Sequence, residues 1–395
     1  MRAVTRPLDA DVDLNDVARG DGYLFVRDRV GFAGRGVAAR VAVDDAVAFL
    51  GGIDHDDGVG DANGPIALGA IPFRPGAPAE LVVPAVVVGK DAAGRAWVTR
   101  IADVDGCDEP LTPDREPTPT AASWSIRPEV DIDQYFAAVA AARDAVRDGH
   151  LRKAVIARPI RVTADREIDV HAVLRRLKAT FGSSHRFSVD GFIGASPELL
   201  VAVDGSVVSS FPLAGTTRTT GNDQLDAELA AELQASPKNR IEHAAAIEMV
   251  RDTLLPYCSY LDWAPEPEIV KVANVQHLGS RAEGMLSSPP ATVVELVRAL
   301  QPTPAVGGHP RDEAIELIDR VEGFERGVYG GAVGWCDGSG NGRWAVSLRC
   351  AELDDDRRSA RLVAGGGIVA DSDPLSELAE TQAKFQAMLS ALVRP

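Results

Sequence analysis

The chain has 395 residues, 45% of them hydrophobic and 25% charged, which is an ordinary globular composition with enough apolar material for a large core. Its formal net charge of −17 argues against nucleic acid and against anionic membrane surfaces as partners. No apolar signal segment opens the chain and no stretch is long enough to span a bilayer, so we expect a soluble cytoplasmic protein.

The first third of the chain predicts short strands with little helix. Residues 1–20 are acidic and weakly patterned, and we expect them to be irregular. Residues 107–122 are rich in proline and polar side chains, which is typical of a linker. Between these two segments the pattern predicts one short helix, at 44–50, and strands at 23–26, 36–41, 66–71, 81–88 and 96–101.

The rest of the chain mixes helices with longer strands. Helices are predicted at 131–148, 223–235, 238–255, 291–300 and 311–321, and after Asp373-Pro374. Strands are predicted at 151–158, where Pro159 should end the strand, and at 187–191, 198–203, 268–283, 330–336, 343–353 and 360–370. Because the strands and helices show no regular βαβ alternation, the pattern indicates an α+β fold with large antiparallel sheets.

The C-terminal stretch 361–384 combines the strongest functional signals. Three glycines interrupt an apolar strand, which indicates close approach of the backbone to another group. On the helix that follows, Glu377, Glu380 and Lys384 are spaced to share one face. Backbone N–H groups, two carboxylates and an ammonium at one strand–helix junction suit an anionic ligand together with a divalent cation. The alternative is a glycine-rich turn before a solvated helix.

Several charged residues occur in otherwise apolar strands. Lys153 in its strand is either a desolvated general base or a strand-edge residue that points to water. Glu198 is either a general acid with a raised pKa or a surface charge at a strand end. Arg349 requires a carboxylate partner, which either the protein or a substrate supplies.

Two further segments suggest how a site is completed. Glu242 near a helix N-terminus either ligates a metal with Glu380 or complements the helix dipole. His277 is read from its isolated position as a hydrogen-bonded structural histidine, since no paired histidine spacing supports a transition metal. The proline- and glycine-dense loop at 301–311 has the rigidity expected of a pocket wall.

Taken together, these segments resemble the chorismate-utilising enzymes, and within them the isochorismate synthases. The resemblance covers about residues 125–390 and rests on motifs that occur in the family's order. They are Lys153 in its strand, Ala-Ser-Pro-Glu-Leu-Leu (195–200), Pro-Leu-Ala-Gly-Thr (212–216), Lys-Asn-Arg-Ile-Glu-His (238–243), Val-Gln-His-Leu (275–278), Pro-Thr-Pro-Ala-Val-Gly-Gly (302–308), Gly-Val-Tyr-Gly-Gly (327–331), Ala-Val-Ser-Leu-Arg (345–349), Ala-Gly-Gly-Gly-Ile-Val (364–369) and Glu-Leu-Ala-Glu-Thr-Gln-Ala-Lys (377–384).

The resemblance implies the chorismate-utilising enzyme fold, a single large α+β domain in which two large antiparallel sheets pack together with helices outside. Residues 1–122 are then a divergent N-terminal part of the same domain, and residues 123–395 form the chorismate-binding catalytic region. The segment at 107–122 becomes an internal connection. The departures from the family pattern are Gln301, where histidine is expected, and Gly366, which is often alanine in relatives.

The resemblance also implies roles for individual residues. Lys153 would be the base that activates water for attack at C2 of chorismate, and Glu198 the acid that protonates the departing C4 hydroxyl. Mg²⁺ would be the only cofactor, held by Glu242 and Glu380 with help from Glu377. The substrate-binding residues implied by the resemblance are Gly215, Thr216, His277, Tyr329, Arg349, Gly365, Gly366 and Lys384.

The expected activity is therefore Mg²⁺-dependent conversion of chorismate to isochorismate, for siderophore or menaquinone biosynthesis. Lys153 separates the chain from ammonia-using relatives, so no glutamine amidotransferase partner is expected, and the resemblance favours a monomer. Two alternatives stay open. A salicylate synthase would share Lys153 and go on to eliminate pyruvate, and a non-catalytic chorismate-binding subunit would bind without turnover.

Overall fold

The computed structural model describes residues 1–395 except 61–63, 102–110, 113–119, 273–274 and 394–395. The strands within this part form three sheets. The largest runs in the order β10 (Trp124–Pro128), β11 (Lys153–Ala164), β25 (Ser359–Ile368), β24 (Cys350–Leu353), β13 (Phe192–Ser196), β12 (His185–Val189), β2 (Tyr23–Arg27), β3 (Val30–Arg35), β8 (Val86–Lys90), β9 (Ala96–Ile101), β1 (Arg2–Pro7) and β5 (Asp54–Asp57), with β21 (Gly308–His309) beside β11.

The second sheet has nine strands and the third has three. The second runs in the order β17 (Cys258–Trp263), β20 (Ala282–Leu286), β15 (Val207–Phe211), β14 (Leu199–Asp204), β23 (Gly342–Val346), β22 (Ala332–Asp337), β6 (Ile66–Ile71), β7 (Glu80–Val83) and β4 (Ala39–Ala42). The third runs in the order β16 (Leu213–Arg218), β19 (Val275–Gly279) and β18 (Glu268–Val272).

The two larger sheets pack face to face. Phe25, Phe187 and Phe192 of the first sheet pack in one apolar cluster with Val333 and Ala345 of the second. A neighbouring cluster joins side chains of β2, β3, β8 and β9 to side chains of β6 and β7. Burial of these side chains drives the association of the sheets, at roughly 25 cal/mol for each Å² of apolar surface removed from water. The expected pair of packed sheets is confirmed, with the three-stranded sheet as an addition.

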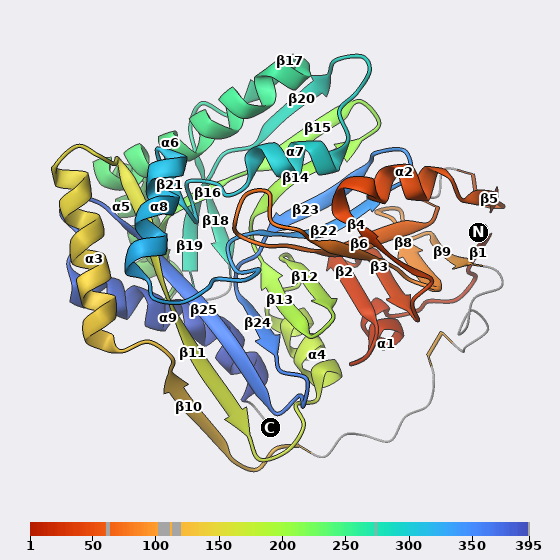
Figure 1. Ribbon diagram of the computed structural model, residues 1–395, viewed down its shortest axis with the longest axis horizontal. Helices are drawn as coiled ribbons and strands as arrows, with labels where there is room; N and C mark the ends of the chain where they lie inside the picture. Colours follow the sequence, from red (N-terminus) through yellow and green to blue (C-terminus); the bar gives the residue numbers. More distant parts are fainter. Residues whose placement is uncertain (61–63, 102–110, 113–119, 273–274, 394–395) are drawn as a thin grey trace.

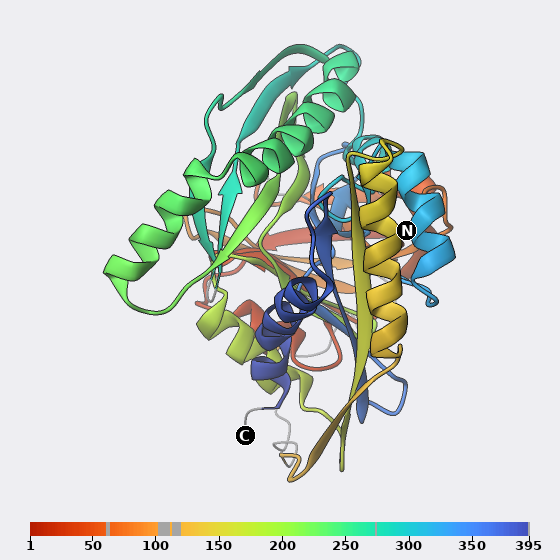
Figure 2. The same cartoon turned by 90° about the vertical axis from the view of Figure 1, so that its left-hand side faces the viewer.

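Helices cover the outer faces, as Figures 1 and 2 show. Helices α1 (Leu14–Ala18), α4 (Val170–Thr180) and α9 (Pro374–Leu392) pack on the larger sheet. Helices α2 (Ala46–Gly51), α6 (Pro237–Leu254) and α7 (Val293–Leu300) pack on the second sheet, while α3 (Ile132–Arg147) and α8 (Arg311–Val321) cover β11. Helix α5 (Asp223–Ala235) lies against β16 and β19. None of the described helices is long and apolar enough to cross a membrane.

The N-terminal third contributes strands to both large sheets. Strands β1, β2, β3, β8 and β9 lie in the first sheet, and β4, β6 and β7 lie in the second. The chain before residue 102 therefore shares its cores with the rest of the molecule. The predicted linker at 107–122 falls largely outside the described residues.

Some sequence-based expectations for local structure were wrong. Residues 1–20 contain β1 and α1, because Ala3 and Thr5 are fully buried between neighbouring strands although the segment is polar overall. Strand β11 does not end at Pro159 but continues to Ala164. The Pro159 carbonyl accepts a hydrogen bond from the Glu129 amide just beyond β10, so the missing proline N–H falls where the β10–β11 ladder ends. Helix α4 and strand β17 were not predicted.

Candidate active site

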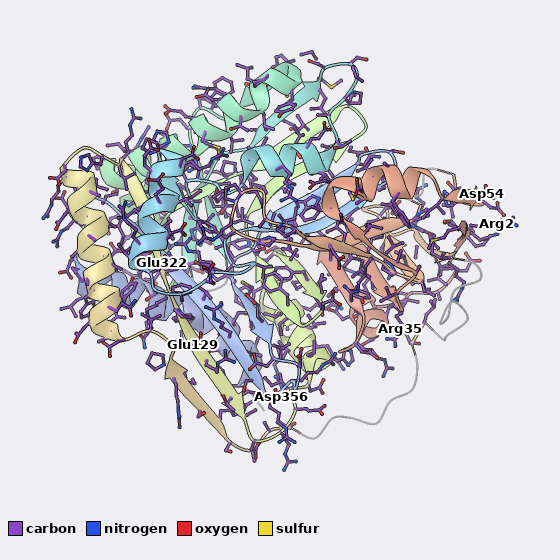
Figure 3. The ribbon with its side chains drawn as sticks, in the orientation of Figure 1. Arg2, Arg35, Asp54, Glu129, Glu322 and Asp356 are labelled. Carbon is purple, nitrogen blue, oxygen red and sulfur yellow. The ribbon has the colours of Figure 1, made fainter. Side chains whose placement is uncertain are left out.

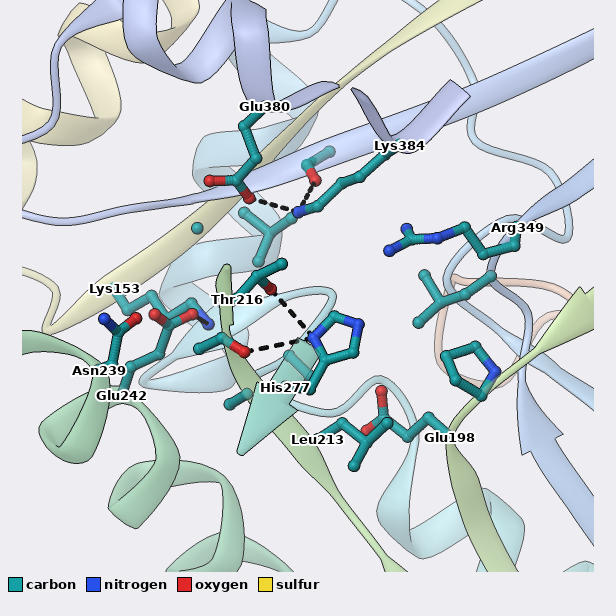
Figure 4. Close-up of a pocket in the computed structure, with 18 of the residues that line it drawn as sticks. Lys153, Glu198, Leu213, Thr216, Asn239, Glu242, His277, Arg349, Glu380 and Lys384 are labelled. Atoms are coloured by element: carbon teal, nitrogen blue, oxygen red, sulfur yellow. Dashed lines mark hydrogen bonds and ion pairs between the residues drawn. The ribbon is translucent and has the colours of Figure 1, made fainter. Parts of the chain in front are cut away.

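A cavity of about 210 Å³ lies where the three sheets meet, and Figure 4 shows its side chains. Lys153, Glu242 and Asn239 lie on one side of the view and Arg349 on the other, with Glu380 and Lys384 above and Glu198 below. The residues that line it are Lys153, Val155, Pro197, Glu198, Leu213, Ala214, Gly215, Thr216, Asn239, Glu242, His277, Ala305, Tyr329, Leu348, Arg349, Gly365, Gly367, Glu380 and Lys384.

Glu198 lies where the chain passes from β13 in the larger sheet to β14 in the second sheet. Its backbone carbonyl accepts a hydrogen bond from the Val346 amide, which ties this crossing to β23. Glu198 is 2% exposed. Burial raises the pKa of Glu198 to about 8, although a hydrogen bond from the Leu213 backbone and the charges of Lys153 and Arg349 act in the opposite direction. Glu198 is therefore a protonated acid at neutral pH.

Arg349 lies at the return crossing, between β23 of the second sheet and β24 of the first. Its φ of +50° lies in the left-handed region, and its carbonyl accepts a hydrogen bond from the Ala195 amide. Burial lowers the pKa of Arg349 from its ordinary value, but a guanidinium stays protonated. Among the described carboxylates, none forms an ion pair with Arg349, so the cavity holds a cation suited to an anionic ligand.

Lys153 and Glu242 form an ion pair on another side of the cavity. Lys153 opens β11 and is 5% exposed, which places its side chain inside the protein. Its Nζ donates a hydrogen bond to Glu242 Oε1 at 2.5 Å. Glu242 comes from α6, whose first turn is capped by the Ser236 hydroxyl and begins with Pro237. The buried strand and the capped helix thus bring together two predicted residues.

Strand β25 and helix α9 provide the upper wall of the cavity. The glycines of β25 pair with β11, with Gly365 opposite Ala157 and Gly367 opposite Val155. Lys384 on α9 donates to Glu380 Oε1 at 2.5 Å and to the Gly365 carbonyl at 2.8 Å. The two residues are one helical turn apart, as their spacing predicted.

Gly366 and Glu377 were predicted in the site but are not among the residues that line the cavity. A Cβ atom at Gly366 would lie 2.7 Å from Glu377 Oε2, so the absence of a side chain at this residue leaves room for that carboxylate. Glu377 is buried, and its Oε1 accepts a hydrogen bond from Ser372 Oγ at 2.7 Å. Both residues lie behind the cavity wall, and the roles predicted for them stay predictions.

His277 on β19 faces a backbone bulge in β16. Gly215 adopts a φ of +74° at this bulge, and its carbonyl lies 3.2 Å from His277 Nδ1. Because a carbonyl only accepts hydrogen bonds, Nδ1 carries the proton and also approaches Thr216 Oγ1 at 3.0 Å. Burial and the charges of Arg349 and Lys384 lower the pKa of His277 to about 3. The ring is therefore neutral, and Nε2, which has no partner among the described residues, is an acceptor.

The remaining lining residues add shape and a few polar groups. Tyr329 is 3% exposed, and burial raises the pKa of its hydroxyl to about 12, so the phenol stays protonated. Asn239 was not predicted, although it lies one turn before Glu242 on α6 and that spacing could have indicated it. Ala305 comes from the loop that the sequence predicted as a pocket wall. The further lining residues that sequence reasoning missed are Val155, Pro197, Leu213, Ala214, Leu348 and Gly367.

The carboxylates around the glycines of β25 have the chemistry that a hard cation prefers. A Cβ atom at Gly367 would lie 2.9 Å from Glu242 Oε1, and one at Gly366 would lie 3.7 Å from Glu380 Oε1. Bare backbone therefore separates Glu242 from Glu380, and Mg²⁺ commonly uses one or two carboxylates together with substrate oxygens and water. Within the described residues, no group of three acidic, histidine or cysteine side chains meets closely enough to form a complete metal cage.

A buried ion pair supports the cavity from behind β11. Glu322, labelled beside α8 in Figure 3, accepts a hydrogen bond from Arg326 Nε at 2.8 Å and one from the Ala157 amide at 2.7 Å. Arg326 also donates to the carbonyls of Val155 and Val306. The pair thus fixes β11 and the loop that carries Ala305.

The packed sheets and the charged cavity at their crossings define a chorismate-binding enzyme. The family profile described as chorismate binding enzyme matches residues 80–393, and the chain belongs to this family.

Its relatives include isochorismate synthases. The chain is 42% identical to a Mycobacterium tuberculosis protein provisionally named isochorismate synthase MenF, over 83% of this chain and 86% of that protein. It is 38% identical to isochorismate synthase DhbC of Bacillus subtilis, over 83% of this chain and 81% of that protein. The solved structure of the menaquinone-specific isochorismate synthase MenF of Escherichia coli aligns over 99% of this chain and 94% of that chain, with a TM-score of 0.84 and 25% identity.

Proposed function

We propose that the protein is an isochorismate synthase that adds water at C2 of chorismate and releases the C4 hydroxyl. The observation that carries this proposal is the buried, protonated Glu198 in the same cavity as the amine of Lys153. Removing a hydroxyl requires an acid, and activating water requires a base. Paired groups of this kind each contribute roughly 10²–10⁴-fold to a rate.

Glu198 is the acid in this proposal. The pKa of about 8 keeps the proton on the carboxyl group at neutral pH, so that it can be donated to the departing hydroxyl as the C4–O bond breaks. The resulting carboxylate would be stabilised by the charges of Lys153 and Arg349, which already favour the ionised form.

Lys153 is the base. It would take a proton from the incoming water as the C2–O bond forms, and it must be a neutral amine at that moment. In the present geometry its Nζ donates to Glu242 Oε1 at 2.5 Å. The Lys153–Glu242 contact must therefore open before the amine can face water.

The substrate carries two carboxylates, and the cavity offers separate groups to hold them. Arg349 and Lys384 are the cations that we assign to the enolpyruvyl carboxylate, with the Tyr329 hydroxyl as a neutral donor. His277 Nε2 is a free acceptor for a ring hydroxyl, since its other nitrogen is committed to Gly215. These assignments give each side of the substrate a distinct set of contacts.

We further propose that Mg²⁺ is the cofactor and that Glu242 and Glu380 hold it. When bound, the cation would supply positive charge for the ring carboxylate of the substrate. The oxygen donors on either side of the β25 glycines fit this role. We also propose that the enzyme is a cytoplasmic monomer without a glutamine amidotransferase partner. We propose that its product enters siderophore or menaquinone biosynthesis; the Escherichia coli neighbour is described as menaquinone-specific.

The test is incubation of the purified protein with chorismate, with and without Mg²⁺ and with ammonium salts, followed by chromatography of the products. We expect isochorismate alone, and only in the presence of Mg²⁺. Lys153→Ala should abolish the product, whereas the exposed control Lys271→Ala should retain it. Salicylate with pyruvate would assign the chain to the salicylate synthases. Chorismate binding without any product would overturn the enzyme assignment.

A further inference from the structure

The buried arginines outside the active site differ in how their charge is compensated. Arg35, labelled near α1 in Figure 3, pairs with Asp21 at 3.2 Å, and Arg326 pairs with Glu322. Arg158 has two aromatic rings against its guanidinium, in addition to hydrogen bonds from Nε and Nη2. Arg186 differs from all of these, because in the described part of the chain it has one side-chain hydrogen bond, to a neutral amide, and neither an ion pair nor an aromatic ring against its guanidinium.

Arg186 is 2% exposed on β12, and its Nη1 donates to Asn15 Oδ1 at 2.9 Å. Its Nε is buried and has no hydrogen-bond partner in the described part of the chain. Burial lowers the pKa of Arg186 to about 10, with Asp13 and Asp28 opposing this shift through space, so the side chain stays charged at neutral pH. A buried charge without a paired anion is costly for a fold to retain.

Arg186 lines a second cavity of about 170 Å³, which shares no lining residue with the chorismate site. This cavity lies among α1, β2, β8, α4 and β12, and four cations and two aspartates line it. The charged members are Arg29, Lys90, Lys178, Arg186, Asp11 and Asp13. The lining is thus net positive in a protein whose formal net charge is −17.

The geometry of the neighbours keeps Arg186 in place while leaving its charge uncompensated. Asn15 Nδ2 donates to Asp13 Oδ1 at 2.7 Å, and Lys178 Nζ donates to Asp13 Oδ2 at 2.5 Å. Lys90 Nζ donates to Asp11 Oδ1 at 2.9 Å near the surface. Each aspartate therefore has a lysine partner, and Arg186 contacts neither of them.

We propose that this second cavity, formed around Arg186, binds a small anion that carries a phosphate or carboxylate group. The cavity is large compared with the roughly 30 Å³ share of one water molecule, which gives room for inorganic phosphate or a short dicarboxylate. The Arg186 guanidinium can supply charge-assisted hydrogen bonds, and Lys90 and Lys178 add positive charge to the lining. The proposal concerns a site apart from the catalytic cavity and does not depend on the reaction proposed above.

The test is thermal unfolding of the full chain as sodium phosphate or sodium malonate is added, with sodium chloride at equal ionic strength as the control. We expect Tm to rise with the logarithm of the anion concentration once that concentration exceeds the Kd, by about 3 °C at 100 times the Kd, and no such rise with chloride. The anion that raises Tm more at equal concentration shows whether the cavity prefers phosphate or carboxylate. Titration calorimetry with that anion then gives the Kd for each variant.

Four variants decide where the anion binds. Arg186→Gln should weaken binding roughly tenfold or more, as expected for a lost charge-assisted hydrogen bond. Lys178→Gln changes a half-exposed side chain and should weaken anion binding by a smaller factor. This variant tests the proposal if Arg186→Gln does not fold. Lys271→Gln on β18 is the matched surface control, and Arg349→Gln removes the anion-binding cation of the catalytic cavity.

The expected pattern is weaker binding in the first two variants and unchanged binding in the last two. Loss of binding in Arg349→Gln alone would place the anion in the catalytic cavity and overturn the proposal. Equal affinity of Lys178→Gln, Arg186→Gln and the unchanged protein would also overturn it. So would the absence of saturable binding by either anion.

Discussion

Two buried glutamates on either side of β11 illustrate how the same side chain supports structure in one place and chemistry in another. Glu198 and Glu322 are each 2% exposed. Glu322 accepts hydrogen bonds from Arg326 and from the Ala157 amide, so that its negative charge is directly paired. Glu198 receives a backbone hydrogen bond and has cations only at longer range, so burial keeps its proton in place.

This difference separates stability from function. A buried carboxylate with its own arginine cannot change its charge without disrupting the fold. A buried carboxyl group without a direct counter-ion holds a transferable proton near neutral pH, which a general acid requires. The two glutamates therefore predict opposite consequences of the same glutamate-to-glutamine change.

Glu198→Gln should have the largest effect on activity. It removes the proton donor while preserving the shape of the protonated side chain, so kcat should fall by roughly 10²–10⁴-fold. The free energy of unfolding at pH 7 should rise, because the unfolded glutamate is ionised and must take up a proton on folding, whereas glutamine needs none. Product assays and urea unfolding measure the two quantities, with exposed Glu268→Gln as the control. Full activity in Glu198→Gln would remove the acid from the mechanism.

Glu322→Gln should have the largest effect on stability. It leaves Arg326 buried without its anion, which typically costs about 3–5 kcal/mol of unfolding free energy. Glu325→Gln, three residues further along and 80% exposed, should cost less than about 1 kcal/mol. Urea unfolding of the two variants makes the comparison. Equal midpoints would show that the buried pair does not stabilise the fold.

The pH dependence should distinguish Glu198 directly. The acid form of Glu198 is lost as pH rises through about 8, so kcat should fall about tenfold per pH unit above that value. The free energy of unfolding should also fall as pH rises. The raised pKa of Glu198 favours the folded state at low pH, and this contribution is lost as pH rises from the ordinary value of 4.5 to about 8. Urea midpoints of the unchanged protein and of Glu198→Gln across pH 5–9 should therefore differ in slope.

Thr216→Val should have the smallest effect. It removes the hydroxyl that lies 3.0 Å from His277 Nδ1 but leaves the Gly215 carbonyl to hold the ring. The loss of one hydrogen bond of this kind, about 0.5–1.5 kcal/mol, corresponds to roughly 2–10-fold in kcat/KM. Thr217→Val, the next residue on the same strand, is the matched control. A loss as large as that of Glu198→Gln would give Thr216 a direct part in the reaction.

Much of the site could be predicted because its residues stand in short motifs with strong local constraints. The resemblance named Lys153, Glu198, Glu242, Arg349 and Lys384, and all five line one cavity. The helix spacing predicted that Glu380 and Lys384 share one face, and there the two side chains form an ion pair. The helices at 223–235 and 311–321 have the predicted bounds; Asn222 caps the first, and Pro310 directly precedes the second.

The remaining features depend on pairing between distant segments, which no local pattern contains. The position of Gly366 behind the wall, and of Gly367 on it, follows from the register of β25 against β11. The strand at the N-terminus forms because Ala3 and Thr5 are buried against β9, not because its own sequence is apolar. Apolar lining residues such as Leu213 and Leu348 carry no chemical signal that distinguishes them from the core.

The place of β25 in the larger sheet has a consequence for how the protein is made. It lies between β11 and β24 and, with α9, supplies Gly365, Gly367, Glu380 and Lys384 to the cavity. During synthesis, β11 leaves the ribosome long before β25, so the edge of β11 that pairs with β25 stays unpaired until β25 is made. The catalytic cavity is therefore completed only after β25 and α9 have left the ribosome, because a chain that stops before β25 lacks these four lining residues.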